Sequence, residues 1–219
     1  MPRIARTHQQ TALCYHVFNR GINRQPIFRD EHDRDFLIKA VRKYKRMCGV
    51  RIFHWAWMET HYHLLIEVPF QRLRSFVGGF QQAYAQYHHA RHGTSGVFWQ
   101  GRYRSEPVEI GDYLACCGRY IERNPVRAGI ASCAWEYPWS SARFYVAGEQ
   151  DGVTDANTHL GFDEITPRDR KLYGDALMST EIDTQMREMR QQRVLGSRGF
   201  VKGLEAKGGR HKAKRGRRW

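Results

Sequence analysis

The sequence predicts an α+β fold, in which helices pack on a single antiparallel sheet in the ferredoxin-like, split βαβ arrangement. Two kinds of hydrophobic pattern lead to this prediction: alternation with a period of two, typical of strands, and a 3.6-residue period, typical of helices. Along the chain they occur in the order strand, helix, strand, strand, helix, strand, with one more helix after the last strand. Apolar residues make up 41% of the 219 residues, enough to build a core.

The first strand and helix occupy the N-terminal part of this pattern. Apolar side chains alternate over Ala12–Asn19, and the strand is closed by a polar, glycine-containing turn. The segment Asp30–Met47 has an apolar stripe at helical spacing, and Gly49 is placed to end that helix.

Two further strands are predicted to form a hairpin. Val50–Met58 and His61–Val68 both alternate, and only two residues separate them. Strict alternation in the first of these places Val50, Ile52, His54 and Ala56 on one face and Arg51, Phe53, Trp55 and Trp57 on the other. We expect Trp55 and Trp57 to pack in the core. In the second strand, His61 and His63 point to the same face of the sheet.

The remaining elements complete the motif. A helix is predicted over Arg72–His92, and a strand over Val97–Ile110 that Pro107 interrupts. A last helix is predicted over Asp112–Asn124, with Asp112 as its N-cap and Pro125 ending it. This helix is expected to cover the face of the sheet to which the two histidines point.

The composition of the sequence changes after this motif. We predict one domain over residues 1–147 and a C-terminal extension over residues 148–219 that is partly helical. The extension is weakly helical over residues 163–195 and becomes glycine-rich and basic from Gly196 onward. Its terminal basic run is expected either to bind DNA or to be disordered.

Charge points to a polyanionic partner. The chain has 36 Lys and Arg against 22 Asp and Glu, a net charge of +14. Residues 208–219 contribute six basic residues and no acid, so the rest of the chain still carries +8. Nucleic acid is the first candidate partner, ahead of an anionic membrane surface. No apolar run is long enough to span a membrane.

Cysteine usage and the N-terminus indicate a cytoplasmic protein. The chain has five cysteines, an odd number without CxxC spacing, so free thiols are expected rather than disulfides or structural zinc. The first ten residues lack the apolar segment of a secretory signal.

A possible metal site lies at the His61-Tyr62-His63 strand. Same-face neighbours on a strand are roughly 6.5–7 Å apart, so the two imidazoles can converge on one divalent ion. Tyr120 and Asn124 are four residues apart and share a helical face, and Asn124 offers an amide oxygen as a third ligand. Such a mixed N/O site suits Mg²⁺ or Mn²⁺. The alternatives are packed histidines, a core Tyr120 and an Asn124 that caps its helix.

Several motifs resemble one family in the same order along the chain. They are Tyr15 to Gly21, His61-Tyr62-His63 followed by Leu64 to Glu67, Phe98 to Tyr103, Tyr120 to Gly129, and Pro138-Trp139-Ser140-Ser141. Together, over about residues 10 to 145, they resemble the HUH endonucleases of the single-tyrosine transposase type, in the branch called REP-associated tyrosine transposases. The fold expected above agrees with that resemblance.

The resemblance implies an activity and a substrate. It implies a metal-dependent endonuclease and strand transferase that acts on single-stranded DNA carrying REP-type hairpins. Tyr120 would be the nucleophile that forms a 5′-phosphotyrosine, and His61, His63 and Asn124 would hold Mg²⁺ or Mn²⁺. The branch is thought to act as monomers. Tyr113, two turns earlier, is the competing nucleophile, but it lacks a ligand four residues later.

Basic residues are the candidates for DNA contacts, since single strands are held by basic grooves. They are Arg3, Arg6, Arg102, Arg104, Arg210, Lys212, Lys214 and Arg215. Two other functions remain open. One is a non-catalytic, sequence-specific DNA-binding protein that regulates at palindromic repeats. The other is an RNA-binding module, because similar folds bind RNA; the partial RNP-like run Arg198–Val201 lacks the strand context and is given little weight.

Overall fold

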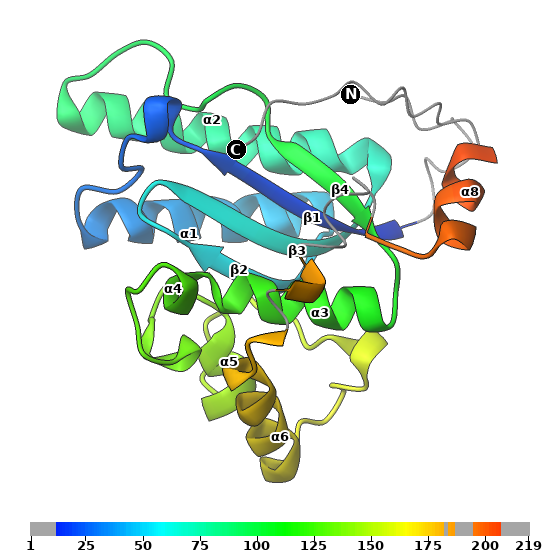
Figure 1. Cartoon of the computed structure of the whole chain (residues 1–219). Helices are drawn as coiled ribbons and strands as arrows, with labels where there is room; N and C mark the ends of the chain where they lie inside the picture. Colours follow the sequence, from blue (N-terminus) through cyan, green and yellow to red (C-terminus); the bar gives the residue numbers. More distant parts are fainter. Residues whose placement is uncertain (1–11, 182–183, 187–194, 207–219) are drawn as a thin grey trace.

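Four antiparallel strands form one sheet in the order β2-β3-β1-β4. They are β1 (Ala12–Arg20), β2 (Arg51–Trp57), β3 (His61–Pro69) and β4 (Arg104–Val108). The structure is a computed structural model that describes residues 12–181, 184–186 and 195–206. Helices α1 (Glu31–Cys48) and α2 (Phe70–His92) cover one face of the sheet, and α3 (Asp112–Glu122) covers the other (Figure 1). The predicted fold class and element order are confirmed.

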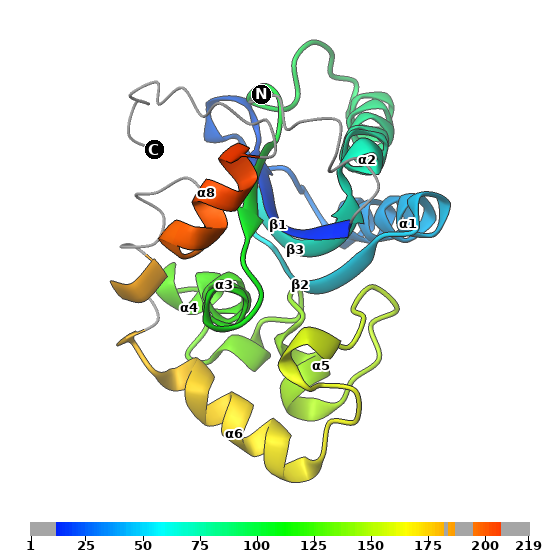
Figure 2. The same ribbon diagram turned by 90° about the vertical axis from the view of Figure 1, so that its right-hand side faces the viewer.

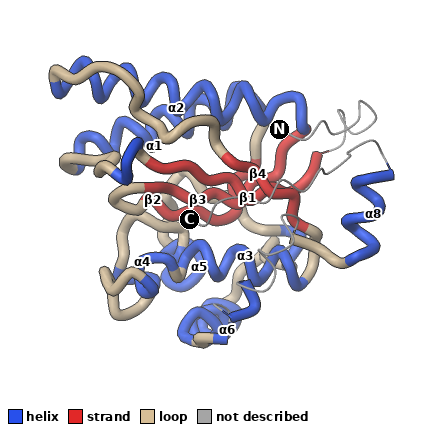
Figure 3. The backbone as a smooth tube through the Cα atoms, turned by 45° about the horizontal axis from the view of Figure 1, so that its top comes forward, coloured by secondary structure: helices blue, strands red, loops and turns tan. Residues whose placement is uncertain are grey.

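The sheet lies between the α1–α2 layer and α3 (Figure 3), and an apolar core fills each side. Alternation along β3 sends Tyr62, Leu64 and Ile66 toward α1 and α2, and Leu65 toward α3. Trp55 and Trp57 are buried in the α1–α2 core, as predicted. The two histidines of β3 therefore lie on the side that α3 covers.

Strand β2 departs from the strict alternation predicted for it. The pairing with β3 shifts register between Ile52 and His54, which marks a β-bulge. The bulge adds one residue, so Ile52 lies in the same core as Trp55, while Phe53 faces the α3 side together with Ala56. The predicted grouping of Ile52 with Ala56, and of Phe53 with the tryptophans, is therefore wrong.

The strand predicted over Val97–Ile110 is much shorter in the structure. Only Arg104–Val108 pairs with β1, and Pro107 lies within this strand. Residues 97–103 form a loop in which Phe98 and Trp99 pack on the α1–α2 core. Aromatic residues favour strands, which is why this segment was predicted to be one. In the structure these aromatic side chains pack between α2 and the end of β1.

The ends of the α3 helix also differ from the prediction. Asp112 is the first helical residue and makes no capping hydrogen bond; the N-cap is Gly111, whose φ of 106° favours glycine. Pro125 does not end the helical path, because it lies in the first turn of a short helix, α4 (Asn124–Arg127), where its missing N–H is tolerated.

The described part of the C-terminal extension packs against the sheet and its helices. The remaining helices are α5 (Ala142–Ala147), α6 (Pro167–Met178) and α8 (Arg198–Ala206), with 3₁₀ turns η2 (Ile22–Arg24), η3 (Ala134–Glu136) and η4 (Thr158–Leu160). Helix α6 lies farther from the sheet than α5, and α8 lies near β4 (Figure 1 and Figure 2). Leu195 is buried and forms a parallel bridge with Val108, which extends the sheet edge. The division at residue 147 stays a prediction.

The described residues also bear on two smaller predictions, the RNP-like run and the lack of a membrane span. The RNP-like run Arg198–Val201 lies in the helix α8 rather than in a strand, which agrees with its low weight. Among the described residues, no helix combines the length and the apolar character needed to cross a membrane.

Candidate active site

The two histidines of β3 lie beside each other on the face covered by α3. Their ring centroids are 5.2 Å apart and the rings are nearly perpendicular, at 88°. His63 is buried, while His61 is half-buried at the start of the strand. The structure therefore brings together the imidazole pair that the sequence predicted.

Hydrogen bonds engage the same nitrogen of each ring. Nδ1 of His61 lies 3.1 Å from Oγ1 of Thr60, and Nδ1 of His63 lies 2.9 Å from Nε2 of His16. For His61, Nε2 is therefore the nitrogen that the ring offers to an ion. Burial, and secondarily Arg20, lowers the pKa of His61 to about 4, so the ring is neutral at pH 7. Neutral imidazoles oriented through their other nitrogen suit a divalent metal.

His16, on β1, is a site residue that the sequence analysis missed. It is fully buried, and its Nδ1 lies 3.5 Å from Oε2 of Glu106 on β4. Glu106, His16 and His63 thus lie in a row across three adjacent strands, and the contact between His16 and His63 orients the His63 ring. Alternation does predict that His16 faces away from Tyr15 and Val17. Only the register of the strands shows that it reaches His63.

Tyr120 reaches the histidines from α3. Its ring centroid lies 6.2 Å from that of His63, at 80°, and 6.4 Å from that of His16. The guanidinium carbon of Arg127 lies 4.6 Å from the centroid of the Tyr120 ring. The ring is 6% exposed and also belongs to the α3-side apolar core. Both predicted placements of Tyr120, in the core and beside the histidines, therefore hold.

Asn124 caps the tyrosine helix. Its buried side-chain Nδ2 donates to the backbone oxygens of Tyr120 at 2.9 Å and Ile121 at 3.1 Å. This is the capping role left open above. Because the nitrogen makes both of these hydrogen bonds, Oδ1 is the atom that Asn124 offers to an ion. Its role as a metal ligand stays a prediction.

Tyr113 and Glu67 have other surroundings. Tyr113 is half-buried and packs against the α3-side core, whereas the ring contacts to His16 and His63 come from Tyr120. Glu67 pairs with Arg51 at 3.2 Å and with His159 at 3.0 Å. Glu67 is therefore engaged in ion pairs rather than with the histidine pair.

A basic pocket opens beside the histidines. Its volume is about 360 Å³, and its lining includes both histidines, no acidic residue and four arginines. The arginines are Arg20, Arg24, Arg102 and Arg104. Of the predicted DNA contacts, Arg102 and Arg104 line this pocket, whereas Arg3, Arg6, Arg210, Lys212, Lys214 and Arg215 lie outside the described residues. Tyr120 and Asn124 are not part of the lining.

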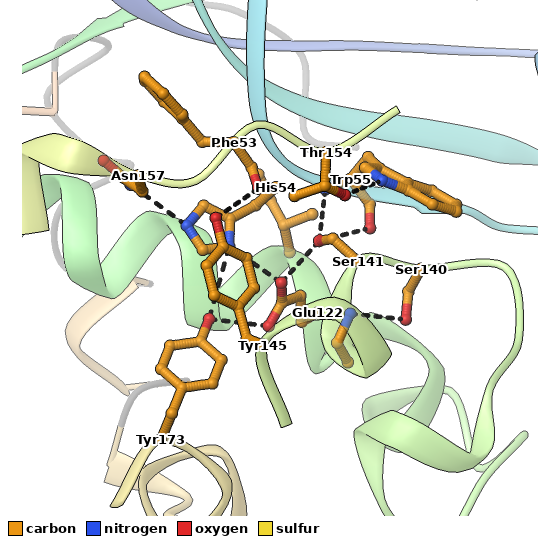
Figure 4. Close-up of polar contacts among 12 residues, drawn as sticks. Phe53, His54, Trp55, Glu122, Ser140, Ser141, Tyr145, Thr154, Asn157 and Tyr173 are labelled. Atoms are coloured by element: carbon orange, nitrogen blue, oxygen red, sulfur yellow. Dashed lines mark hydrogen bonds and ion pairs between the residues drawn. The ribbon is translucent and has the colours of Figure 1, made fainter. Parts of the chain in front are cut away.

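A buried polar network holds the tyrosine helix in place (Figure 4). Glu122, at the end of α3, lies 2.9 Å from Nδ1 of His54 and accepts hydrogen bonds from Ser141 at 2.6 Å and Tyr173 at 2.8 Å. Glu122 and Ser141 are fully buried, and so is His54 on β2. The network therefore joins α3 to the sheet, to the start of α5 and to α6.

The network also explains a glycine within α3. A Cβ on Gly118 would lie 2.7 Å from the His54 ring, so only glycine lets the helix approach β2 this closely. The backbone N–H of Trp55 donates to Oγ of Ser141 at 2.9 Å, which ties the Pro138–Ser141 motif to the strand after its bulge. These contacts fix the distance between the sheet and α3, the helix that carries Tyr120.

An antiparallel sheet whose central strand presents a His-x-His pair to a tyrosine on the covering helix is the architecture of the single-tyrosine HUH enzymes. The sequence matches the family model described as Transposase IS200 like over residues 9–124. This match spans more than half of the chain, and the protein belongs to that family of transposases.

One solved structure agrees at the level of the fold, and a second match is weaker. A REP-associated tyrosine transposase bound to a REP hairpin is 20% identical, with a TM-score of 0.56, covering 72% of this chain and 93% of that chain. A transposase candidate from Deinococcus radiodurans is 21% identical, with a TM-score of 0.38, covering 54% of this chain and 85% of that chain. No curated protein matches the sequence.

Proposed function

We propose that this transposase cleaves single-stranded DNA beside REP-type hairpins and transfers the strand through a 5′-phosphotyrosine at Tyr120. The observation that carries this proposal is the ring contact between Tyr120 and His63, next to a pocket lined by four arginines. The solved relative that shares the fold was bound to a REP hairpin, which supports the substrate class. We further propose that the protein acts as a monomer in the cytoplasm.

Each side chain has a role in the proposed reaction. The phenol oxygen of Tyr120 loses its proton and bonds to the scissile phosphorus, while the bond to the 3′ oxygen breaks and that oxygen takes up a proton. Arg127 places a positive charge against the Tyr120 ring, where it stabilises the negative charge of the attacking oxygen. The reverse reaction joins the 5′ end to a new 3′-OH and restores the phenol.

The donor set fits a divalent metal, because two imidazole side chains and the amide oxygen of Asn124 form a mixed N/O ligand set. Mg²⁺ or Mn²⁺ bound by His61, His63 and Asn124 would neutralise charge on the scissile phosphate. His16 orients His63 through its Nδ1, and Thr60 orients His61. Arg102 and Arg104 hold the DNA backbone at the mouth of the pocket.

A covalent-adduct assay tests the proposal. Labelled single-stranded DNA carrying a hairpin is incubated with the protein and Mg²⁺ or Mn²⁺, then denatured and separated by size. We expect a protein–DNA adduct that survives denaturation and requires the metal. Hairpin binding without any adduct would instead identify the non-catalytic regulator.

The basic tail gives a second prediction. Deleting residues 208–219 removes six positive charges, so it should weaken hairpin binding and reduce the steepness of its salt dependence. The measurement is the dissociation constant at several salt concentrations. An unchanged slope would show that the tail makes no contact with the phosphates.

A further inference from the structure

A second histidine cluster lies across the sheet from the candidate active site, where α1 begins and α2 ends. One ligand atom each from Asp33, His88 and His92 lies within 4.8 Å of the other two. Asp33 is fully buried at the first turn of α1, and the two histidines are four residues apart, so they share a face of α2. Their ring centroids are 4.4 Å apart.

His88 is the unexplained member of the cluster. It is only 5% exposed, yet neither ring nitrogen has a hydrogen-bond partner among the described residues. A buried polar group without a partner has lost its hydrogen bonds to water and gained none in return, so such groups are rare in folded proteins. His92 differs, because its Nε2 lies 3.0 Å from both carboxylate oxygens of Asp33.

We propose that Asp33, His88 and His92 bind a divalent metal ion, with Zn²⁺ as the best fit, separate from the candidate catalytic site. Two imidazole nitrogens and one carboxylate oxygen are a ligand set that zinc favours, and a water completes four-coordination. The bound ion gives the buried His88 ring the partner that it lacks. It also ties the start of α1 to the end of α2.

The charges around the cluster are compatible with a cation. Arg91 contacts Asp33 at 2.6 Å, but both of its terminal nitrogens also bond to Asp30, at 2.7 Å each. Arg91 therefore stays paired with Asp30 when Asp33 turns one oxygen to a metal.

The other three-residue group among the described residues is a weaker candidate. Cys14, Glu67 and His159 also lie close together, but none of their nitrogen or oxygen atoms is buried without a hydrogen-bond partner, unlike the two ring nitrogens of His88.

The test uses the untagged full-length protein in which His61→Ala and His63→Ala remove the candidate catalytic site. Zn²⁺ is titrated by calorimetry, and Co²⁺ by its visible absorption. We expect one tight site per chain, and a Zn²⁺-dependent rise in melting temperature. Adding His88→Leu should weaken Zn²⁺ binding by at least about 100-fold, since it removes a direct ligand.

A neighbouring histidine provides the matched control. His89→Leu replaces a ring that bonds to Thr94 and Gly96 and lies outside the cluster, so Zn²⁺ binding should persist. His88→Leu should leave the metal-free melting temperature unchanged or higher, because it removes two unpaired buried nitrogens. Absence of a tight site, or equal Zn²⁺ binding with leucine at residue 88, overturns the proposal. Either result leaves the proposed nuclease activity untouched.

Discussion

Replacing the tyrosine nucleophile, Tyr120→Phe, should abolish the covalent adduct with hairpin DNA. The change removes only the phenol oxygen, which is the atom that bonds to phosphorus. Loss of a nucleophile from a working active site lowers the rate by on the order of 10⁴-fold or more. The measurement is the fraction of labelled DNA that stays bound to the protein after denaturation.

The same variant should still fold and bind DNA. The phenylalanine ring keeps the edge contact with His63 and the contact with Arg127. The melting temperature and the dissociation constant for the hairpin should therefore stay close to those of the natural protein. Tyr113→Phe is the matched control, since that ring packs on the same helix without the histidine contacts, and its adduct should form normally. An adduct that persists in Tyr120→Phe but disappears in Tyr113→Phe would move the nucleophile to Tyr113.

Much of this site was predictable because short-range patterns determine it. Alternation alone puts His61 and His63 on one face of β3, and helical spacing relates Tyr120 to Asn124. The order of the elements then requires the last helix to cover the face opposite α1 and α2. Those three inferences are enough to bring a tyrosine toward the histidine pair, and the structure agrees.

The parts that escaped prediction depend on contacts between distant segments. Because of the bulge in β2, Ile52 shares a core with Trp55 and Phe53 shares the other core with Ala56, contrary to strict alternation. No local pattern in the sequence indicates this bulge. His16 and Glu106 become a chain to His63 only through the register of three strands. The loop over residues 97–103 looked like a strand, because the aromatic residues that fill a core are also those that favour strands.

Removing the buried carboxylate in the network below the tyrosine helix, Glu122→Ala, should strongly destabilise the protein. Glu122 is the common partner of His54, Ser141 and Tyr173, so its loss leaves three buried polar groups without that acceptor. Breaking a buried pair in this way costs about 3–5 kcal/mol. For a chain of this size, that loss lowers the melting temperature by about 6–20 °C.

Two graded variants separate the network from a general effect of losing charge. Glu149→Ala removes a carboxylate of the same kind from an exposed pair with Arg143 and should change the melting temperature little. Tyr173→Phe removes one hydrogen bond to Glu122 and should cost about 1.5–3 kcal/mol. Equal melting temperatures for Glu122→Ala and Glu149→Ala would contradict the network.

The network should also affect the reaction, since Glu122 lies two residues after Tyr120 on the same helix. Below its lowered melting temperature, Glu122→Ala should bind hairpin DNA but form less adduct, because α3 is no longer tied to His54 and α6. Glu122→Gln keeps a side chain that can hydrogen-bond and should recover part of the adduct. If adduct formation per bound DNA is unchanged in Glu122→Ala, then the apolar contacts of α3 alone are sufficient to position Tyr120.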